Sequence, residues 1–374
     1  MQKILIASVL KPVSDTRMYA KIGQTLAENK EFSVIIVGYS STVPFTKKIK
    51  FYPLFKFKRI SFKRILAPWK VLHSVLKEKP AVFIITTYEL LFQACLFKLL
   101  LKGKIIYDIQ ENYYRNRLYM KTIPVPLHRL LALWVRMKEK FFAPFFDGFL
   151  LAEKIYAQQL PFIQGKGRLI LENKFLESGN FTPRKTPVKF SGLKKLDLVY
   201  TGTVSEEYGV LDAIQFVEGI NRQKGYRYAR LLILGYAAHA KFAAAIAKAC
   251  SGLDFVKVAI QAEPVPHTKI VEAQQKADFV LLPYRANKAM EGKIPTKFYE
   301  ALALHIPVIT SKNRALAPAL EKYKAGIEVD FRKPDYQNIV NILDNEVFYT
   351  DLPKNEVLWS AEKKQLFRFI LEIL

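Results

Sequence analysis

The stretch PTKFYEALALHIPVIT, from Pro295 to Thr310, predicts a helix that leads directly into a buried strand. Pro295 suits the first turn of a helix, where its missing N–H would have had no partner. The apolar run that begins at Pro307 is typical of a strand inside a sheet. A helix that alternates with a buried strand indicates an α/β protein with a parallel sheet.

Apolar runs and helix-like segments continue to alternate in both directions from this stretch. The strands predicted in the first half are Ile4 to Val9, Phe32 to Val37, Ala81 to Thr86, Lys104 to Asp108 and Gly148 to Leu151. Those predicted in the second half are Leu196 to Tyr200, Arg230 to Leu234, Asp278 to Pro283 and Pro307 to Thr310. One predicted helix is capped by Ser14 and runs to about Asn29. The other main helices are predicted over Glu206 to Asn221, His239 to Ala249 and Thr296 to Leu304. Each half is therefore expected to form its own doubly wound, Rossmann-like sheet with helices on both faces.

The segment from Leu171 to Lys195 interrupts this alternation and is rich in Pro, Gly, Ser and Lys. Such a composition is typical of a boundary between domains. We therefore predict an N-terminal domain over residues 1–172, a linker over 173–195 and a C-terminal domain over 196–355. Apolar residues at helical spacing from Ser360 to Leu374 predict a final helix, within residues 356–374, that packs across both lobes.

The composition excludes several classes of protein. Hydrophobic residues make up 51% of the 374 residues, which is too many for a disordered chain. Cys95 and Cys250 have no further Cys or His at metal-ligand spacing, which argues against a disulfide framework and a zinc site. The opening MQKILIASVL is too short for a signal peptide, and we expect the chain to be cytoplasmic. Glu89 and Lys98 interrupt the most apolar stretch, Val82 to Leu101, so we interpret it as a strand and an amphipathic helix rather than a membrane span.

Positive charge is concentrated in one part of the chain. The formal net charge is +25, and residues 41–141 hold about 21 Lys and Arg against about 5 Asp and Glu. In FYPLFKFKRISFKRIL, from Phe51 to Leu66, the basic residues alternate with bulky apolar ones, a mixture that suits an anionic lipid interface. A merely basic, water-exposed lobe is the alternative. Binding to nucleic acid is not expected, because no recognition module is visible.

The segment VYTGTVSEEYG, from Val199 to Gly209, combines a strand end, a glycine turn and a helix start. Gly202 lets the backbone turn close to a ligand, and Thr203 adds a hydroxyl donor. Gly209 lies near the start of the following helix, where free N–H groups and the helix dipole favour a phosphate. A turn with a purely structural role would have the same sequence pattern.

Two charged residues lie at the start of the helix after Pro295. Lys297 can meet a phosphate there, and the carboxylate of Glu300, one turn further, can accept two hydroxyls of a ribose. The alternative for Glu300 is a water-exposed helix charge, and periodicity alone does not decide between the two.

The chain resembles the GT-B fold retaining glycosyltransferases of family 4, also called group 1. The resemblance extends over nearly the whole chain, and its strongest segment is FYEALALHIPVITS, preceded by ADFVLLPY (Ala277 to Tyr284) and VYTGTVSEEYGVLDAI. The opening ILIASVLKPVSDTRMYAKIGQTLA and the segment IIYDIQENY (Ile105 to Tyr113) resemble the strands of the acceptor-binding lobe. The resemblance implies a sugar transfer from a nucleotide-sugar donor that is UDP-, GDP- or ADP-linked.

The resemblance also implies roles for individual residues of the donor-binding lobe. Glu300 corresponds to the second glutamate of a paired-glutamate motif, which binds the donor ribose, and Gly202 and Thr203 fall in the diphosphate loop. The loop from Glu291 to Thr296 falls where the family holds the transferred sugar and its phosphates.

The sequence departs from the family pattern in three places. Gly292 occupies the place of the first glutamate, with Glu291 one residue away, and Thr203 and Tyr208 stand where an Arg and a Lys hold the diphosphate. Gln110 is found near the place of a His. The residues expected to supply the missing positive charge are Lys297 first, then Lys293 and Arg285.

On the acceptor side, Asp108 falls at the strand end that faces the sugar. Asp108 and Glu111 are candidates for orienting the acceptor or stabilising positive charge, and a structural role is equally open for both. Asp15 and Arg17 follow the first strand and are expected on the acceptor side, although Asp15 can instead cap the helix.

No Asp-x-Asp occurs in the sequence, so we expect a metal-independent reaction without a cofactor, in which amides, a helix start and a Lys stabilise the leaving diphosphate. The expected acceptor is a glycan or a lipid-linked glycan, reached by an enzyme that is peripheral on the inner face of the plasma membrane. Two alternatives stay open: a sugar-nucleotide 2-epimerase of the same fold, and a non-catalytic partner subunit.

Overall fold

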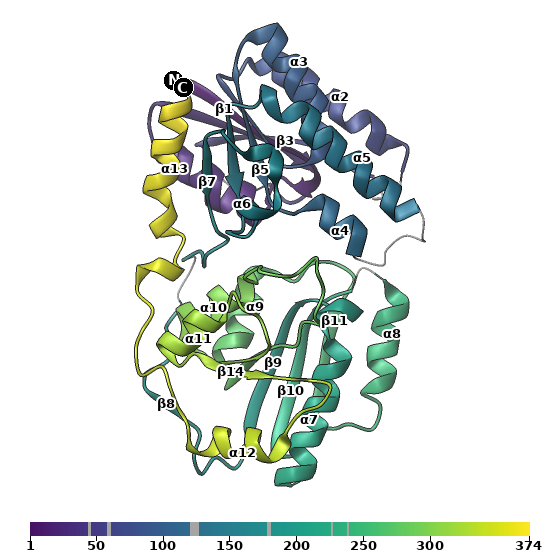
Figure 1. Ribbon diagram of the computed structural model, residues 1–374, viewed down its shortest axis with the longest axis vertical. Coiled ribbons are helices and arrows are strands. Elements are labelled where there is room, and N and C mark those ends of the chain that lie inside the picture. Colours follow the sequence, from purple (N-terminus) through teal and green to yellow (C-terminus); the bar gives the residue numbers. More distant parts are fainter. Residues whose placement is uncertain (44–45, 58–60, 120–126, 178–180, 226, 238) are drawn as a thin grey trace. The chain divides into compact units, whose positions relative to one another are not determined.

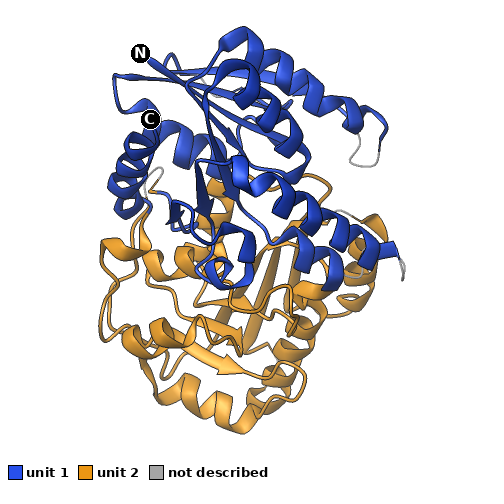
Figure 2. Cartoon of the chain, turned by 45° about the horizontal axis from the view of Figure 1, so that its top comes forward, with its two compact units in different colours: residues 1–176, 359–374 blue, residues 177–358 orange. Residues whose placement is uncertain are grey.

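A computed structural model describes residues 1–43, 46–57, 61–119, 127–177, 181–225, 227–237 and 239–374. The chain forms two compact units (Figure 2). Unit 1 comprises Met1–Leu176 and Trp359–Leu374, and unit 2 comprises Glu177–Leu358. The break between them falls inside the segment predicted as a linker, part of which, residues 178–180, lies outside the described residues.

Unit 1 contains a parallel sheet with the strand order β3-β2-β1-β4-β5-β6-β7 in its described residues. The strands are β1 (Gln2–Pro12), β2 (Phe32–Tyr39), β3 (Ile49–Phe55), β4 (Val82–Ile85), β5 (Lys104–Ile109), β6 (Gly148–Leu151) and β7 (Arg168–Ile170). Ile4 of β1 pairs with Val34 of β2 on one side and with Val82 of β4 on the other. Chain order therefore reverses between β1 and β4, as in doubly wound sheets.

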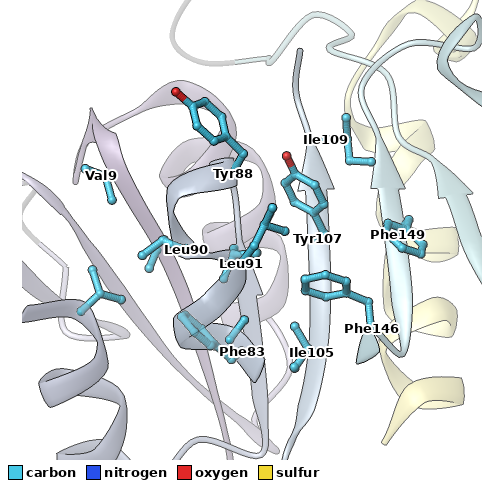
Figure 3. Close-up of a cluster of buried hydrophobic side chains, with 14 of the residues drawn as sticks. Val9, Phe83, Tyr88, Leu90, Leu91, Ile105, Tyr107, Ile109, Phe146 and Phe149 are labelled. Atoms are coloured by element: carbon cyan, nitrogen blue, oxygen red, sulfur yellow. The ribbon is translucent and has the colours of Figure 1, made fainter. Parts of the chain in front are cut away.

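Helices cover both faces of this sheet because alternate side chains of each buried strand point to opposite faces. One core cluster contains Ile105, Tyr107 and Ile109 of β5 together with residues of α2 (Lys63–Glu78), α3 (Leu91–Leu101) and α5 (Leu127–Phe142). Figure 3 shows part of this cluster, with Phe83, Tyr107 and Phe149 contributed by neighbouring strands. The other cluster contains Ile106 of β5 and residues of η1 (Thr16–Gly23), α1 (Gln24–Ala27) and α13 (Ser360–Ile373).

The C-terminal helix α13 is part of unit 1. Leu366, Phe369 and Ile370 of this helix pack in the second cluster. The buried indole of Trp359 donates a hydrogen bond to Thr25 Oγ1 at 2.9 Å. The helix begins at Ser360 as predicted. Its predicted contact with the other lobe stays a prediction.

Unit 2 contains a parallel sheet with the strand order β11-β10-β9-β12-β13-β14 in its described residues. The strands are β9 (Leu196–Thr203), β10 (Ala229–Tyr236), β11 (Val256–Gln261), β12 (Phe279–Leu282), β13 (Val308–Ser311) and β14 (Gly326–Val329). Its helices are η5 (Glu206–Tyr208), α7 (Val210–Lys224), α8 (Ala240–Ala249), α9 (His267–Gln275), α10 (Thr296–Leu304), α11 (Ala317–Tyr323) and α12 (Tyr336–Asn345). The predicted architecture, two doubly wound Rossmann-like sheets, is confirmed.

The remaining elements are short. They are η2 (Tyr88–Leu90), α4 (Tyr113–Tyr119), η3 (Ala143–Phe145), α6 (Tyr156–Gln159), η4 (Pro161–Ile163), the antiparallel pair β8 (Val188–Lys189) and β15 (Val347–Phe348), and η6 (Asn355–Val357). None of the helices in the described part of the chain is both long and apolar enough to cross a membrane. The stretch Val82 to Leu101 forms β4, η2 and α3, so the predicted strand and helix are confirmed.

Part of the predicted lipid-binding segment lies inside the sheet of unit 1, and one predicted helix cap is wrong. Residues 51–55 of the predicted lipid-binding segment lie in strand β3, which pairs with β2, and Phe55 is buried. Residues 58–60 of that segment lie outside the described residues. The cap of the first helix is Asp15 rather than Ser14, because the Asp15 carboxylate accepts from the N–H groups of Arg17 and Met18.

A buried carboxylate in α5 predicts a pH-dependent stability. Glu139 is 2% exposed, and Tyr107 donates its hydroxyl to Oε1 at 3.3 Å, while Oε2 has no hydrogen-bond partner in the described residues. Burial raises the pKa of Glu139 to about 7, although Arg136 and Tyr107 act in the opposite direction. From about pH 4.5 to about pH 7 the unfolded chain loses a proton that the folded chain keeps, so this group makes stability fall as the pH rises.

Glu139→Gln stays neutral at every pH. We therefore expect the variant to differ little in stability from wild type at pH 5 and to be more stable than wild type at pH 8. Urea unfolding at both pH values measures the difference, and Glu31→Gln, at an exposed carboxylate, is the control. The same difference at both pH values would contradict the assignment.

Candidate functional site

The candidate donor site lies in unit 2, where chain order reverses between β9 and β12. In a doubly wound sheet, ligands bind outside the C-terminal strand ends at this reversal. Gly202, near the end of β9, has a φ of 116°, which side-chain-bearing residues rarely adopt. A Cβ at this position would lie 3.6 Å from Cε of Lys297. The structure therefore brings the glycine turn and the start of α10 together.

Helix α10 presents a buried ion pair beside this turn. The Lys297 ammonium donates to both carboxylate oxygens of Glu300, at 2.7 and 2.8 Å, and Glu300 is only 4% exposed. Nε2 of His267 lies 3.1 Å from Oε1 of the same carboxylate. The alternative interpretation of Glu300, a water-exposed helix charge, is therefore wrong.

The surroundings of Glu300 keep it ionised. Burial by itself would raise the pKa of this carboxyl, but the Lys297 ammonium and His267 outweigh burial and lower the pKa to about 2. The group is thus a permanent hydrogen-bond acceptor at neutral pH. A buried, ionised carboxylate at the ligand-binding edge of a parallel sheet is a candidate for binding hydroxyl groups.

His267 was not predicted from the sequence. This residue is the first of α9, at the same edge of the sheet, and it lies 33 positions before Glu300 in the chain. A single His with no motif around it carries no signal that a sequence pattern can show. Helix α9 is held in place by Gln274, whose Nε2 donates to Oγ1 of the buried Thr201 at 3.1 Å.

Arg285 does not join this cluster. Its guanidinium makes two bonds to the Asp212 carboxylate, at 2.7 and 2.9 Å, and one to Glu206 at 2.9 Å. These partners belong to α7 and η5, so the charge of Arg285 is already paired. Arg285 and Asp212 instead line a cavity of about 620 Å³ beyond β12, β13 and β14 that neither Lys297 nor Glu300 lines.

The other donor-side candidates lie around the loop before α10 and at the end of β9. Lys293 is 9% exposed, and its carbonyl oxygen accepts from Nδ2 of Asn313 at 3.0 Å. Glu291 and Thr296 are exposed. Thr203 is half-buried at the end of β9. Their predicted contacts with the donor stay predictions.

The turn from η5 into α7 is fixed by close packing. Gly209 has a φ of 67°, and a Cβ there would come within 1.8 Å of the Pro283 carbonyl oxygen. Only glycine allows the start of α7 to approach the end of β12 so closely. Tyr208, at the place of a family Lys, packs edge-on against Tyr284 with ring centroids 5.3 Å apart.

In unit 1, two candidates from different segments form one buried ion pair. The Arg17 guanidinium, 5% exposed, donates to both oxygens of the fully buried Asp108 at distances of 2.7 to 3.1 Å. Arg17 also donates to the Leu171 carbonyl at 2.7 Å and to Oδ1 of Asn173 at 2.8 Å. Gln110 donates to Asp108 at 2.8 Å. This network joins the ends of β5 and β7 to η1.

The two remaining acceptor-side candidates lie apart from that pair. Asp15 caps η1, as its alternative interpretation predicted, with both accepted N–H bonds at 3.0 Å. Glu111 is exposed and accepts from Nδ2 of Asn116 at 2.8 Å. Their predicted contacts with an acceptor stay predictions.

Comparison with solved structures identifies the fold. Over the whole chain, the fold matches solved GT-B glycosyltransferases. Sucrose-phosphate synthase from Thermosynechococcus elongatus matches with a TM-score of 0.73 and 14% identity over 100% of this chain and 99% of that one. The catalytic domain of starch synthase IV from Arabidopsis thaliana matches with a TM-score of 0.61 and 10% identity over 100% and 99%. UDP-GlcNAc 2-epimerase from Methanocaldococcus jannaschii has a TM-score of 0.57 and 12% identity over 99% of each chain.

Residues 195–345 match the family model "Glycosyl transferases group 1", so unit 2 carries a domain of that family. The family match over unit 2 and the GT-B fold of the whole chain agree with the resemblance that the sequence predicted. No curated protein matches the sequence. Within the described residues, no group of three or more His, Cys, Asp and Glu is placed to hold a metal ion, and the metal-independent reaction stays a prediction.

The Arg17–Asp108 pair predicts a large loss of stability on substitution. Asp108→Ala leaves the Arg17 guanidinium buried without its carboxylate, which costs about 3–5 kcal/mol. Hydrogen exchange in β5 and η1 measures this for unit 1 alone. Glu111→Ala, at an exposed position, should change stability by less than about 0.5 kcal/mol. Equal effects of the two substitutions would show that the pair is not important for stability.

Proposed function

We propose that this glycosyltransferase binds a nucleotide-sugar donor at the edge of β9 and β12 and transfers the sugar to a glycan or lipid-linked glycan. The observation that carries the proposal is the buried Glu300–Lys297 pair beside Gly202. It combines an ionised carboxylate, a lysine ammonium and a backbone turn without a side chain at the place where doubly wound sheets bind nucleotides.

The Glu300 carboxylate suits a hydroxyl of a ribose. A carboxylate has about four acceptor positions, and Lys297 and His267 occupy three of them. The remaining capacity can accept a hydroxyl, and the low pKa keeps the group an acceptor at neutral pH. His267 holds the carboxylate in place from α9 and is a positioning residue.

Lys297 suits the diphosphate. Its ammonium lies beside Gly202, where the missing side chain allows a phosphate to approach the backbone. In the structure Lys297 is bonded to Glu300, so a diphosphate would share this lysine with the carboxylate. Because Thr203 and Tyr208 replace the Arg and Lys of the family pattern, Lys297 would be the main cation at the leaving phosphate.

The solved relatives support a nucleoside diphosphate as the occupant. The starch synthase structure contains ADP and acarbose. The base and sugar of this chain's donor are open among UDP-, GDP- and ADP-linked sugars. We further propose that the reaction is metal-independent and retaining. The proposed acceptor is membrane-associated and contacts Asp108 and Glu111, and the proposed location of the enzyme is the inner face of the plasma membrane.

A thermal-shift screen with UDP-, GDP- and ADP-sugars tests the donor site. One donor class should raise the unfolding temperature of wild type, because ligand that binds only the folded state stabilises it. Lys297→Ala and Glu300→Gln should each weaken the affinity about 10- to 100-fold, the effect of losing one charged hydrogen bond.

Lys248→Ala is the matched control for the donor screen. Lys248 is exposed near the C-terminal end of α8, which lies at the opposite edge of the sheet from the strand ends that bind ligands. A donor shift that survives both site substitutions, or that disappears in the control, would refute this site.

Product analysis separates transfer from epimerisation, which the likeness to UDP-GlcNAc 2-epimerase keeps open. A transferase should release nucleoside diphosphate in proportion to acceptor, whereas a 2-epimerase converts its nucleotide sugar without acceptor. A non-catalytic subunit would do neither while still binding donor. Conversion of the donor sugar in the absence of acceptor would overturn the proposed transfer.

A further inference from the structure

We propose that the outer side of helices α2, α3 and α5 in unit 1 docks flat on an anionic lipid bilayer. We refer to this surface as the three-helix face. The inference goes beyond sugar transfer and does not depend on the donor site, because all of its residues belong to unit 1.

Helix α5 exposes an apolar stripe on its outer side. Leu127, Leu130, Trp134, Met137 and Phe141 follow one another at intervals of three and four residues, which places them along one side of the helix. Met137 and Phe141 are each 69% exposed, and Leu130 is 62% exposed. A helix that covers a sheet and faces water would normally carry polar residues on this side.

Helices α2 and α3 expose apolar residues in the same way. Phe62, Ile65, Leu66 and Trp69 lie along the first part of α2, and Phe62 is 89% exposed. On α3, Phe92 and Leu99 are seven residues apart and both exposed, with Leu100 beside Leu99.

These exposed residues form one continuous surface. The ring centroids of Trp69 and Phe92 lie 6.0 Å apart, so this pair connects α2 to α3. The ring centroids of Phe92 and Phe142 lie 6.3 Å apart, so this pair connects α3 to α5. The ring centroid of Phe142 lies 5.0 Å from that of the exposed Phe141. Figure 1 shows the three helices side by side, on the opposite side of the sheet from α13.

The core of unit 1 does not need this surface. The inner sides of the same helices already fill the core cluster, through residues such as Val71, Phe97 and Val135. Soluble monomers rarely expose apolar patches larger than a few hundred Å². We therefore expect the three-helix face to be covered by a binding partner.

Its charge indicates what covers it. On the three helices, which the structure describes in full, both acidic residues are buried: Glu78, bonded to Lys50 at 2.6 Å, and Glu139. The exposed charged residues of these helices are all basic, namely Lys63, Lys70, Lys77, Arg129 and Lys140. Aromatic and aliphatic groups interspersed with Lys and Arg, without exposed carboxylates, match a surface of anionic headgroups over acyl chains.

The same charge disfavours a second copy of the chain as the partner. A symmetric dimer through the three-helix face would place the basic side chains of one copy against those of the other. An anionic bilayer, in contrast, attracts each of these cations and buries the apolar stripe. No helix in the described part of the chain is fit to span the membrane, so docking would leave unit 1 lying on the surface.

Vesicle flotation of the full chain tests the proposal. Wild type should float with vesicles of phosphatidylcholine mixed with phosphatidylglycerol and much less with phosphatidylcholine alone. The triple variant Leu130→Ser, Trp134→Ser, Met137→Ser removes the stripe at exposed positions and should weaken binding about tenfold or more. The charge variant Lys63→Glu, Lys70→Glu, Arg129→Glu should abolish the preference for anionic lipid.

Matched control variants come from α13, on the opposite face of the sheet. Leu371→Ser controls for the loss of an exposed apolar residue, and Lys364→Glu with Arg368→Glu controls for the charge change. Both should float like wild type. Circular dichroism checks that every variant is folded.

Two results would overturn the proposal. One is wild type that does not float with anionic vesicles, or that floats equally with neutral ones. The other is sedimentation showing a wild-type dimer that the triple variant dissociates, which would assign the three-helix face to contact between copies. Donor binding in the thermal-shift screen is measured without lipid, so its failure and the failure of docking are distinguishable.

Discussion

Parallel strand pairing is the constraint on which the rest of this structure depends. All pairs within the two large sheets are parallel, so each connection must cross over a face of its sheet. The crossovers bury both faces and bring the C-terminal ends of all strands to one edge. In unit 2 this edge gathers Gly202, His267 and Glu300, which come from β9, α9 and α10. The candidate site is thus a consequence of the topology.

At that edge, the chain replaces the usual cations of the group 1 pattern by a compact buried cluster. Tyr208 packs on Tyr284 instead of offering charge, and Arg285 is paired with Asp212. Lys297 is largely buried, lies beside Gly202 and has a carboxylate partner. The same ion pair keeps Glu300 ionised although it is buried, because the attraction of the ammonium outweighs the cost of removing the carboxylate from water.

Unit 1 uses the same layered plan for a different purpose. Its inner helix sides build the core, while the outer sides of α2, α3 and α5 repeat apolar residues that the core does not need. The ends of β5 and β7 are joined to η1 by the buried Arg17–Asp108 pair. One unit thus carries the candidate donor site and the other the proposed lipid-docking face, each on a scaffold of the same kind.

The sequence by itself determined the elements whose signals are local. Helix α10 has the predicted bounds, Thr296–Leu304, and β6 the predicted bounds, Gly148–Leu151, because apolar spacing and flanking Pro or Gly residues act within a few positions. Strand β3 was missed because its apolar residues were interpreted as part of a lipid-binding segment. Strand β11 was missed because its partly exposed sequence shows no buried run. Only the tertiary structure decided that Arg17 meets Asp108, 91 positions away, that His267 meets Glu300, and that the exposed apolar residues of three helices join into one face. Such contacts depend on how strands are ordered in a sheet, and strand order is set by packing between segments that carry no mark of one another in the sequence.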